Sequence, residues 1–177
     1  MINVSAVPDA SNNIRHVATM KKLLVLVVLS ITFVACNQQQ QNKIDSMLRP
    51  EQHAIEVLEK TAEAVNASCP TKAGENYTLV GVHLANGRWT YCYTVAEDSV
   101  VRFDNPLSNE AFAKGMKNAT TETIVRNPSM MTMVNQLIDA KTDLMYEYTG
   151  IETGKTVTIF FTYPELRMIR DMANQSK

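Results

Sequence analysis

Apolar residues recur at helical spacing soon after residue 50, and farther along they alternate with polar ones. Pro50 and Glu51 are typical of the first turn of a helix. The pattern predicts a helix that ends before Cys69-Pro70, with one apolar face made of Ile55, Leu58, Ala62 and Val65.

Residues 77–84 and 89–95 alternate on either side of Asn86-Gly87. This dipeptide supplies the positive φ angles of a type I′ turn, so the segment predicts a β-hairpin. With Asn86 and Gly87 as the loop residues, Cys92 lies opposite Gly81. One face of the hairpin then holds Val80, Val82, Leu84, Trp89, Tyr91, Tyr93 and Val95.

The middle of the chain predicts helices. Ser108 is expected to cap a helix through about residue 117, and residues 120–125 fit no single pattern. Asn127-Pro128 opens a stronger helix to about Ala140. Its inward face consists of Met130, Val134, Leu137 and Ile138.

A second hairpin and a last helix complete the pattern. The hairpin strands alternate at Leu144, Tyr146 and Tyr148 and at Val157, Ile159 and Phe161, with Thr153-Gly154 in the turn. Pro164-Glu165 begins a terminal helix whose apolar side carries Leu166, Ile169 and Met172.

Helix followed by hairpin therefore occurs twice. The order favours an α+β fold, in which an antiparallel sheet of about four strands is covered by helices on one face in two layers. A duplicated helix-hairpin unit is the alternative interpretation.

The strongest apolar run lies near the start of the sequence, where Lys21 and Lys22 precede residues 23–35. A run of about 13 residues is shorter than the roughly 20 that a membrane-spanning helix needs. Together with the lysines it is typical of a secretory signal peptide. The residues before Met20 look like an upstream extension.

The end of this run, Phe33-Val34-Ala35-Cys36, resembles the lipobox of bacterial lipoproteins, although Phe33 stands where leucine is usual. The resemblance implies that Cys36 carries lipid, including palmitate, and becomes the first residue of the mature chain. Two or more acyl chains give stable membrane anchoring. The bilayer is thus the first expected partner.

The chain divides into an extension and signal peptide (1–35), a lipidated cysteine with a polar tether (36–48), and one α+β domain (49–177). After Cys36, Asn37 and Gln38 lack the aspartate that often retains lipoproteins in the inner membrane. We therefore expect an outer-membrane protein that faces the periplasm.

Composition removes one class of partner. The formal net charge is -1, with 17 basic and 18 acidic residues, so nothing favours nucleic acid binding. No phosphate-binding glycine loop or other cofactor motif is present, and no cofactor is expected.

Cys69 and Cys92 fall in the folded part. An exported chain meets an oxidising compartment, so we expect them to form a disulfide worth about 3 kcal/mol in the chain-entropy model. Two free thiols or a redox pair are the alternatives, and no CxxC spacing supports the redox pair.

Few residues suggest a ligand site. Trp89, Tyr91 and Tyr93 form an aromatic stripe that could stack on a sugar, a peptide or a partner, although a buried sheet face explains them more simply. Core packing likewise explains the methionines better than cuprous ion does. The other candidates are Met130, Met131, Met133, His53, His83, Glu97, Asp98, Asp104 and Glu147.

The two histidines after Cys36, His53 and His83, lack the paired spacing of a zinc site, and no metal is predicted. No catalytic motif is present, so we expect a non-catalytic binding or accessory module with a protein partner in the cell envelope. The alternatives are a small envelope enzyme acting on carbohydrate or peptide, with Trp89 and Glu97 in its site, and a copper-binding protein.

Overall fold

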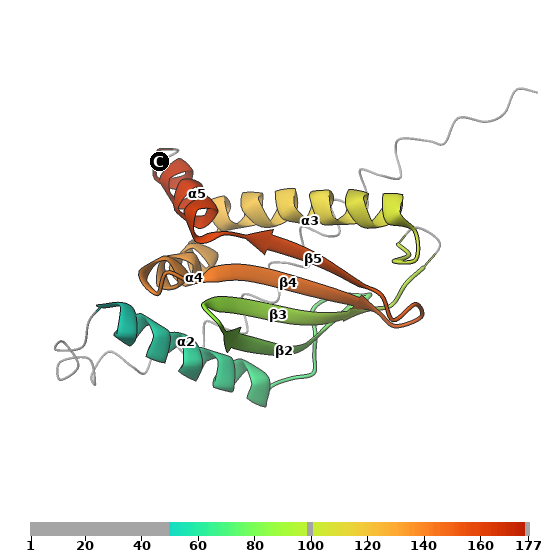
Figure 1. The fold of residues 1–177 in the computed structure, drawn as a ribbon, viewed down its shortest axis with the longest axis horizontal. Helices are drawn as coiled ribbons and strands as arrows, with labels where there is room; N and C mark the ends of the chain where they lie inside the picture. Colours follow the sequence, from blue (N-terminus) through green and yellow to red (C-terminus); the bar gives the residue numbers. More distant parts are fainter. Residues whose placement is uncertain (1–49, 99–100, 176–177) are drawn as a thin grey trace, which may run out of the picture.

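The computed structural model describes residues 50–98 and 101–175, so the predicted signal peptide, Cys36 and the tether lie outside the described residues. Figure 1 shows strands β2 to β5 side by side, with α2 and α3 along the sheet and α4 and α5 at one end. The elements are α2 (Pro50–Ala67), β1 (Thr71–Lys72), β2 (Tyr77–Ala85), β3 (Arg88–Val95), α3 (Pro106–Arg126), α4 (Pro128–Asp139), β4 (Asp143–Gly150), β5 (Thr156–Phe161) and α5 (Tyr163–Gln175).

The sheet has five strands in the order β1-β2-β3-β4-β5. Both predicted hairpins are present, but β3 and β4 pair in parallel, so the prediction of an antiparallel sheet of about four strands is wrong on this point. The physical reason is the connection between them. The chain crosses over through α3 and α4 and returns to the end of the sheet where β3 began.

The first hairpin turns at Asn86 and Gly87, whose φ angles are 52° and 68°. Both values lie in the left-handed region that a type I′ turn requires. The predicted register is also confirmed here, because Gly81 pairs with Cys92.

The register shifts between Leu79 and Gly81, which makes Val80 an extra residue in β2. Leu79, instead of Val80, is therefore the inward residue opposite Tyr93. Val80 keeps 44% of its surface exposed, so its predicted place on the buried face is wrong. A bulge of this kind cannot be seen in an alternating pattern alone.

Helix α2 buries Ala54, Leu58, Ala62 and Val65 as predicted, with Ala54 in place of Ile55 at the start. Its Asn66 side chain reaches the backbone of β2. Asn66 Nδ2 donates to Val82 O at 2.8 Å, and Val82 N donates to Asn66 Oδ1 at 2.7 Å. The side chain thus takes the place of a neighbouring strand at this edge.

The crossover consists of two helices. Asn105, and not the predicted Ser108, caps α3, which continues without interruption to Arg126. Asn127 then caps α4 by accepting hydrogen bonds from Ser129 N and Met130 N. The buried face of α4 is the predicted one.

Helix α5 begins at the predicted place and buries Leu166, Ile169 and Ala173. Met172 was expected on the same side but keeps 50% of its surface exposed. Ala173, one residue farther along, lies where the helix meets the rest of the molecule.

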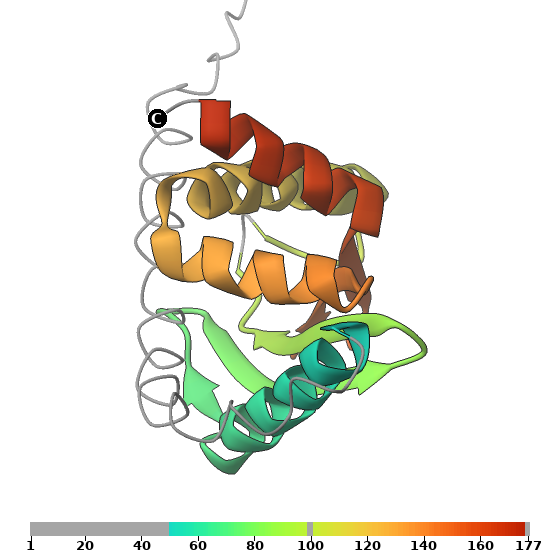
Figure 2. The same cartoon turned by 90° about the vertical axis from the view of Figure 1, so that its left-hand side faces the viewer.

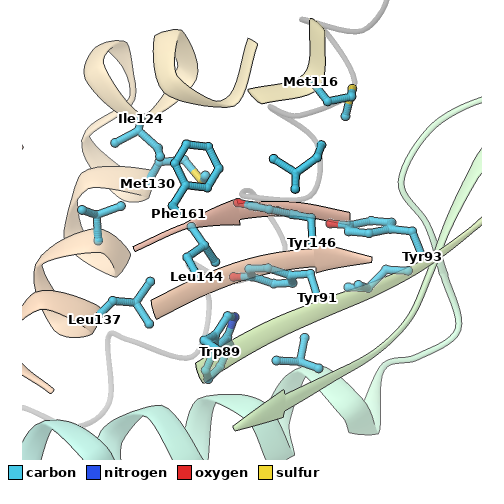
Figure 3. Packing of buried hydrophobic residues seen from close by; sticks show 14 of the residues in the cluster. Trp89, Tyr91, Tyr93, Met116, Ile124, Met130, Leu137, Leu144, Tyr146 and Phe161 are labelled. Carbon is cyan, nitrogen blue, oxygen red and sulfur yellow. The ribbon is translucent and has the colours of Figure 1, made fainter. Parts of the chain in front are cut away.

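One hydrophobic cluster includes residues of β2 to β5 and of all four described helices. Its strand members all come from one face of the sheet, so the helices cover one face, as predicted. Figure 3 shows Trp89 and Tyr91 of β3 near Leu144 of β4, with Leu137 of α4 close by. The two hairpins do not occupy equivalent places, because the second ends in the edge strand β5, whereas both strands of the first have neighbours on each side.

Candidate functional site

The predicted aromatic stripe lies on the inner face of β3, with exposed fractions of 0% for Trp89, 5% for Tyr91 and 7% for Tyr93. Because β3 and β4 are in parallel register, Tyr91 pairs with Tyr146 and Tyr93 with Tyr148. Their rings stack with centroids 5.2 Å and 5.1 Å apart. Tyr91 and Tyr93 therefore belong to a group of four stacked tyrosines inside the core, and Figure 3 shows three of them, Tyr91, Tyr93 and Tyr146.

Burial sets the chemistry of these tyrosines. It raises the pKa of Tyr91 to about 12 and raises the pKa values of Tyr93, Tyr146 and Tyr148 well above their ordinary value. Their hydroxyl groups consequently stay protonated even at a pH at which an exposed tyrosine ionises. A sugar or peptide would have to enter the core to reach these rings.

The two cysteines lie on opposite sides of the sheet. Cys69 follows α2 and packs against the core, whereas the Cys92 side chain projects from the outer face of β3, with Sγ 3.8 Å from Glu147 Oε2. Both are free cysteines, so the predicted disulfide is not formed in this structure.

Neither thiol is activated. Burial raises the pKa of Cys69, and burial together with the Glu147 carboxylate raises the pKa of Cys92 to about 11. A reactive cysteine needs the thiolate, which a depressed pKa supplies. The free-thiol alternative therefore describes both residues better than a redox pair does.

The outer face of the sheet carries side chains in rows that cross the strands. The first row is Thr78, Thr94, Thr149 and Thr156, one from each strand β2 to β5. The Oγ1 atoms of Thr149 and Thr156 lie 2.9 Å apart. The next two rows are Gly81, Cys92, Glu147 and Thr158, and His83, Thr90, Met145 and Phe160.

Arg88 extends this surface at the end of the sheet near the Asn86-Gly87 turn. Its guanidinium carbon lies 5.1 Å from the centre of the Phe160 ring, two strands away. The outer face thus combines hydroxyl groups, the basic side chain of Arg88, the acidic side chain of Glu147 and the half-buried ring of Phe160. The described helices place their apolar side chains on the other face.

At the opposite end of the sheet from the Asn86-Gly87 turn, the Glu97 carboxylate accepts hydrogen bonds from the surrounding loops. Its carboxylate accepts hydrogen bonds from Phe103 N, Glu152 N, Thr153 N and Thr153 Oγ1 at 2.7 to 3.1 Å. Its own N–H donates to Glu152 Oε2 at 2.8 Å. Glu97 therefore connects the loop after β3 to the turn between β4 and β5.

This carboxylate packs against Gly150. A Cβ atom added at Gly150 would lie 2.3 Å from Glu97 Oε2 and 2.4 Å from Cδ, so a side chain cannot be accommodated there without movement. Sequence reasoning missed this contact. A glycine at the end of an alternating strand was the available signal, because glycine often marks a close approach.

The other candidate carboxylates are engaged locally. Asp104 pairs with Arg102 at 2.9 Å, and Asp98 Oδ1 accepts a hydrogen bond from Val101 N at 2.8 Å. His53 lies on α2 and His83 on the outer face of β2. In residues 50–98 and 101–175, no three histidine, cysteine, aspartate or glutamate side chains are grouped to hold a metal ion.

The methionines of α4 pack as core residues. Met130 is 8% exposed, and the half-buried Met131 and Met133 contact the same hydrophobic cluster. No helix in the described part of the chain is long and apolar enough to span a bilayer.

No protein-family model matches this chain. No curated protein matches it either. Among solved structures, it is similar to a Pseudomonas aeruginosa protein described as secreted, with 16% sequence identity and a TM-score of 0.49. The match covers 67% of this chain and 96% of that one. A likeness of this degree says nothing about activity.

Proposed function

We propose that this chain is a lipid-anchored envelope protein whose folded domain binds another envelope protein and catalyses no reaction. Lipid on Cys36 would hold it at the outer membrane, with the domain in the periplasm. The lipobox-like sequence at residues 33–36 supports the anchor.

The outer face of the sheet is the observation that carries the binding role. One row of threonines crosses four strands, and the same face also carries Arg88, Glu147 and Phe160. Surfaces that mix polar and apolar groups suit protein partners, whereas small ligands favour concave, mostly apolar sites. A polypeptide is therefore the occupant that this face fits.

The enzyme alternative receives less support from the geometry. Trp89 is enclosed at the start of β3, and Glu97 lies beyond its end, about 26 Å away at the usual rise per strand residue. Glu97 also uses its carboxylate to connect loops, as described above. These two residues do not form a common site.

The test is a crosslinking pull-down of the native lipidated protein from cell envelopes, with a charge added to the sheet face. Thr158→Glu places a carboxylate on the exposed part of the outer face, and Thr132→Glu places the same group on the exposed side of α4. We expect Thr158→Glu to reduce recovery of the crosslinked partner at least fivefold and Thr132→Glu to leave it unchanged.

Two controls complete the experiment. Cys36→Ala should lose the partner because the protein no longer reaches the membrane. Equal recovery with Thr158→Glu and the wild type would show that the partner, if any, binds elsewhere, and would contradict the role of this face.

A further inference from the structure

Helix α5 is apolar on two sides. Leu166, Ile169 and Ala173 face the core, whereas Met168 and Met172 keep 59% and 50% of their surface exposed. The two methionines are four residues apart and so lie next to each other along the helix. Single exposed apolar residues are ordinary, but an adjacent pair on a helix forms a continuous apolar stripe.

This stripe lies at the end of the molecule where the described chain begins. Lys141 Nζ binds Glu51 Oε2 at 2.6 Å, which places the first turn of α2 beside the start of β4. Tyr163 N donates to Asp143 Oδ1 at 2.7 Å, which places the first turn of α5 there too. Figures 1 and 2 show the start of α2 and helix α5 at the same end of the sheet.

The proposed lipid anchor lies close in sequence to that end. From Cys36 to Pro50 the chain advances 14 positions by the numbering, which spans at most about 50 Å when fully extended. The bilayer is therefore always within reach of the α2 and α5 end. A tether of this length gives the surface a local concentration in about the millimolar range, so a weak contact is sufficient.

We propose that the Met168–Met172 stripe of α5 rests on the bilayer surface and orients the anchored domain, a step that depends on the proposed lipid anchor. Unbranched methionine side chains adapt to irregular apolar surroundings such as the interface of acyl chains and headgroups. Arg167 lies beside the stripe, with its guanidinium 5.8 Å from the Tyr163 ring, and reaches headgroup level from there. The outer face of the sheet remains free for a protein partner.

The test measures depth in the membrane with tryptophan fluorescence. Native Trp89 is fully enclosed in the core and provides a constant background. Met172→Trp adds an indole to the stripe, and Leu107→Trp adds one at the start of α3, at the opposite end of the molecule (Figure 1). Both positions are exposed, so both variants are expected to fold, which circular dichroism verifies.

Each lipidated protein is reconstituted in vesicles of phosphatidylethanolamine and phosphatidylglycerol with brominated acyl chains, which quench nearby indoles. We expect at least twofold stronger quenching for Met172→Trp than for Leu107→Trp. If the protein floats with the vesicles but quenching is equal for both variants or absent, the stripe does not contact the bilayer. That result would overturn the inference and favour a protein partner for the stripe. Failure of the wild type to float would overturn the lipid anchor itself.

Discussion

Glu97 and Gly150 depend on each other, because the carboxylate occupies the space that any side chain at position 150 would need. We expect Gly150→Ala to lower the free energy of unfolding by about 2 kcal/mol or more through overpacking. Gly115 is the matched control, since it lies inside α3 with nothing within 4 Å of an added Cβ. Gly115→Ala should raise stability by up to about 1 kcal/mol through helix propensity. Chemical denaturation measures the change in the free energy of unfolding for each variant. A change of the same sign in both variants would contradict the prediction.

The Glu97 carboxylate also predicts a pH dependence. Burial acts to raise its pKa, but hydrogen bonds from Phe103, Thr153 and Glu152 outweigh burial and hold the pKa below the ordinary value of 4.5. A lowered folded-state pKa stabilises the protein above pH 4.5, and this contribution is lost as the pH falls through the folded value. Glu97→Gln should be less stable at pH 7 and should lose less stability between pH 5 and pH 3. Parallel curves for both proteins in urea titrations would contradict this.

At the scale of elements, Asn66 protects an edge of the sheet. Its side chain forms hydrogen bonds with both the N–H and the C=O of Val82, at a position where β1 no longer pairs with β2. We expect Asn66→Ala to destabilise the fold by about 1–3 kcal/mol and to increase self-association through the opened edge. Asn118→Ala, on the exposed side of α3, is the control. Denaturation and size-exclusion chromatography measure the two effects, and an Asn66→Ala variant with wild-type behaviour in both would contradict the role.

Local signals predicted the elements well because each depends on neighbours in sequence. Asn86 and Gly87 adopt the positive φ angles of the turn themselves, and Asn127 and Pro128 form the cap and first residue of their helix. Sheet order has no such local signal. The parallel pairing of β3 and β4 follows from the crossover through α3 and α4, and the bulge at Val80 leaves no signal in the alternating pattern of β2.

The candidate site was harder to predict for the same reason. The threonine row joins Thr94 to Thr149, and this contact exists only in the parallel register. In an antiparallel arrangement the two residues would not be neighbours. The inner aromatic stripe, by contrast, follows from alternation within β3, which is why its burial could be predicted from the sequence.

For the whole molecule, the single core predicts cooperative unfolding. The cluster around Trp89 contains side chains from every described helix and from β2 to β5, so no element has a core of its own. We expect fluorescence of Trp89 and far-ultraviolet circular dichroism to give the same denaturation midpoint. Two separate midpoints would show that part of the fold unfolds independently.

The parallel pair of β3 and β4 also has a consequence for the order in which the chain is made. The β2–β3 hairpin closes locally as soon as Val95 is available, but its aromatic side remains without a stacking partner until Tyr146 and Tyr148 follow, more than 50 residues later. A nascent chain therefore lacks the stacking partners of Tyr91 and Tyr93 for that interval. During this interval the chain is most prone to aggregation, and the aromatic residues of β3 are the segment to which a chaperone would bind.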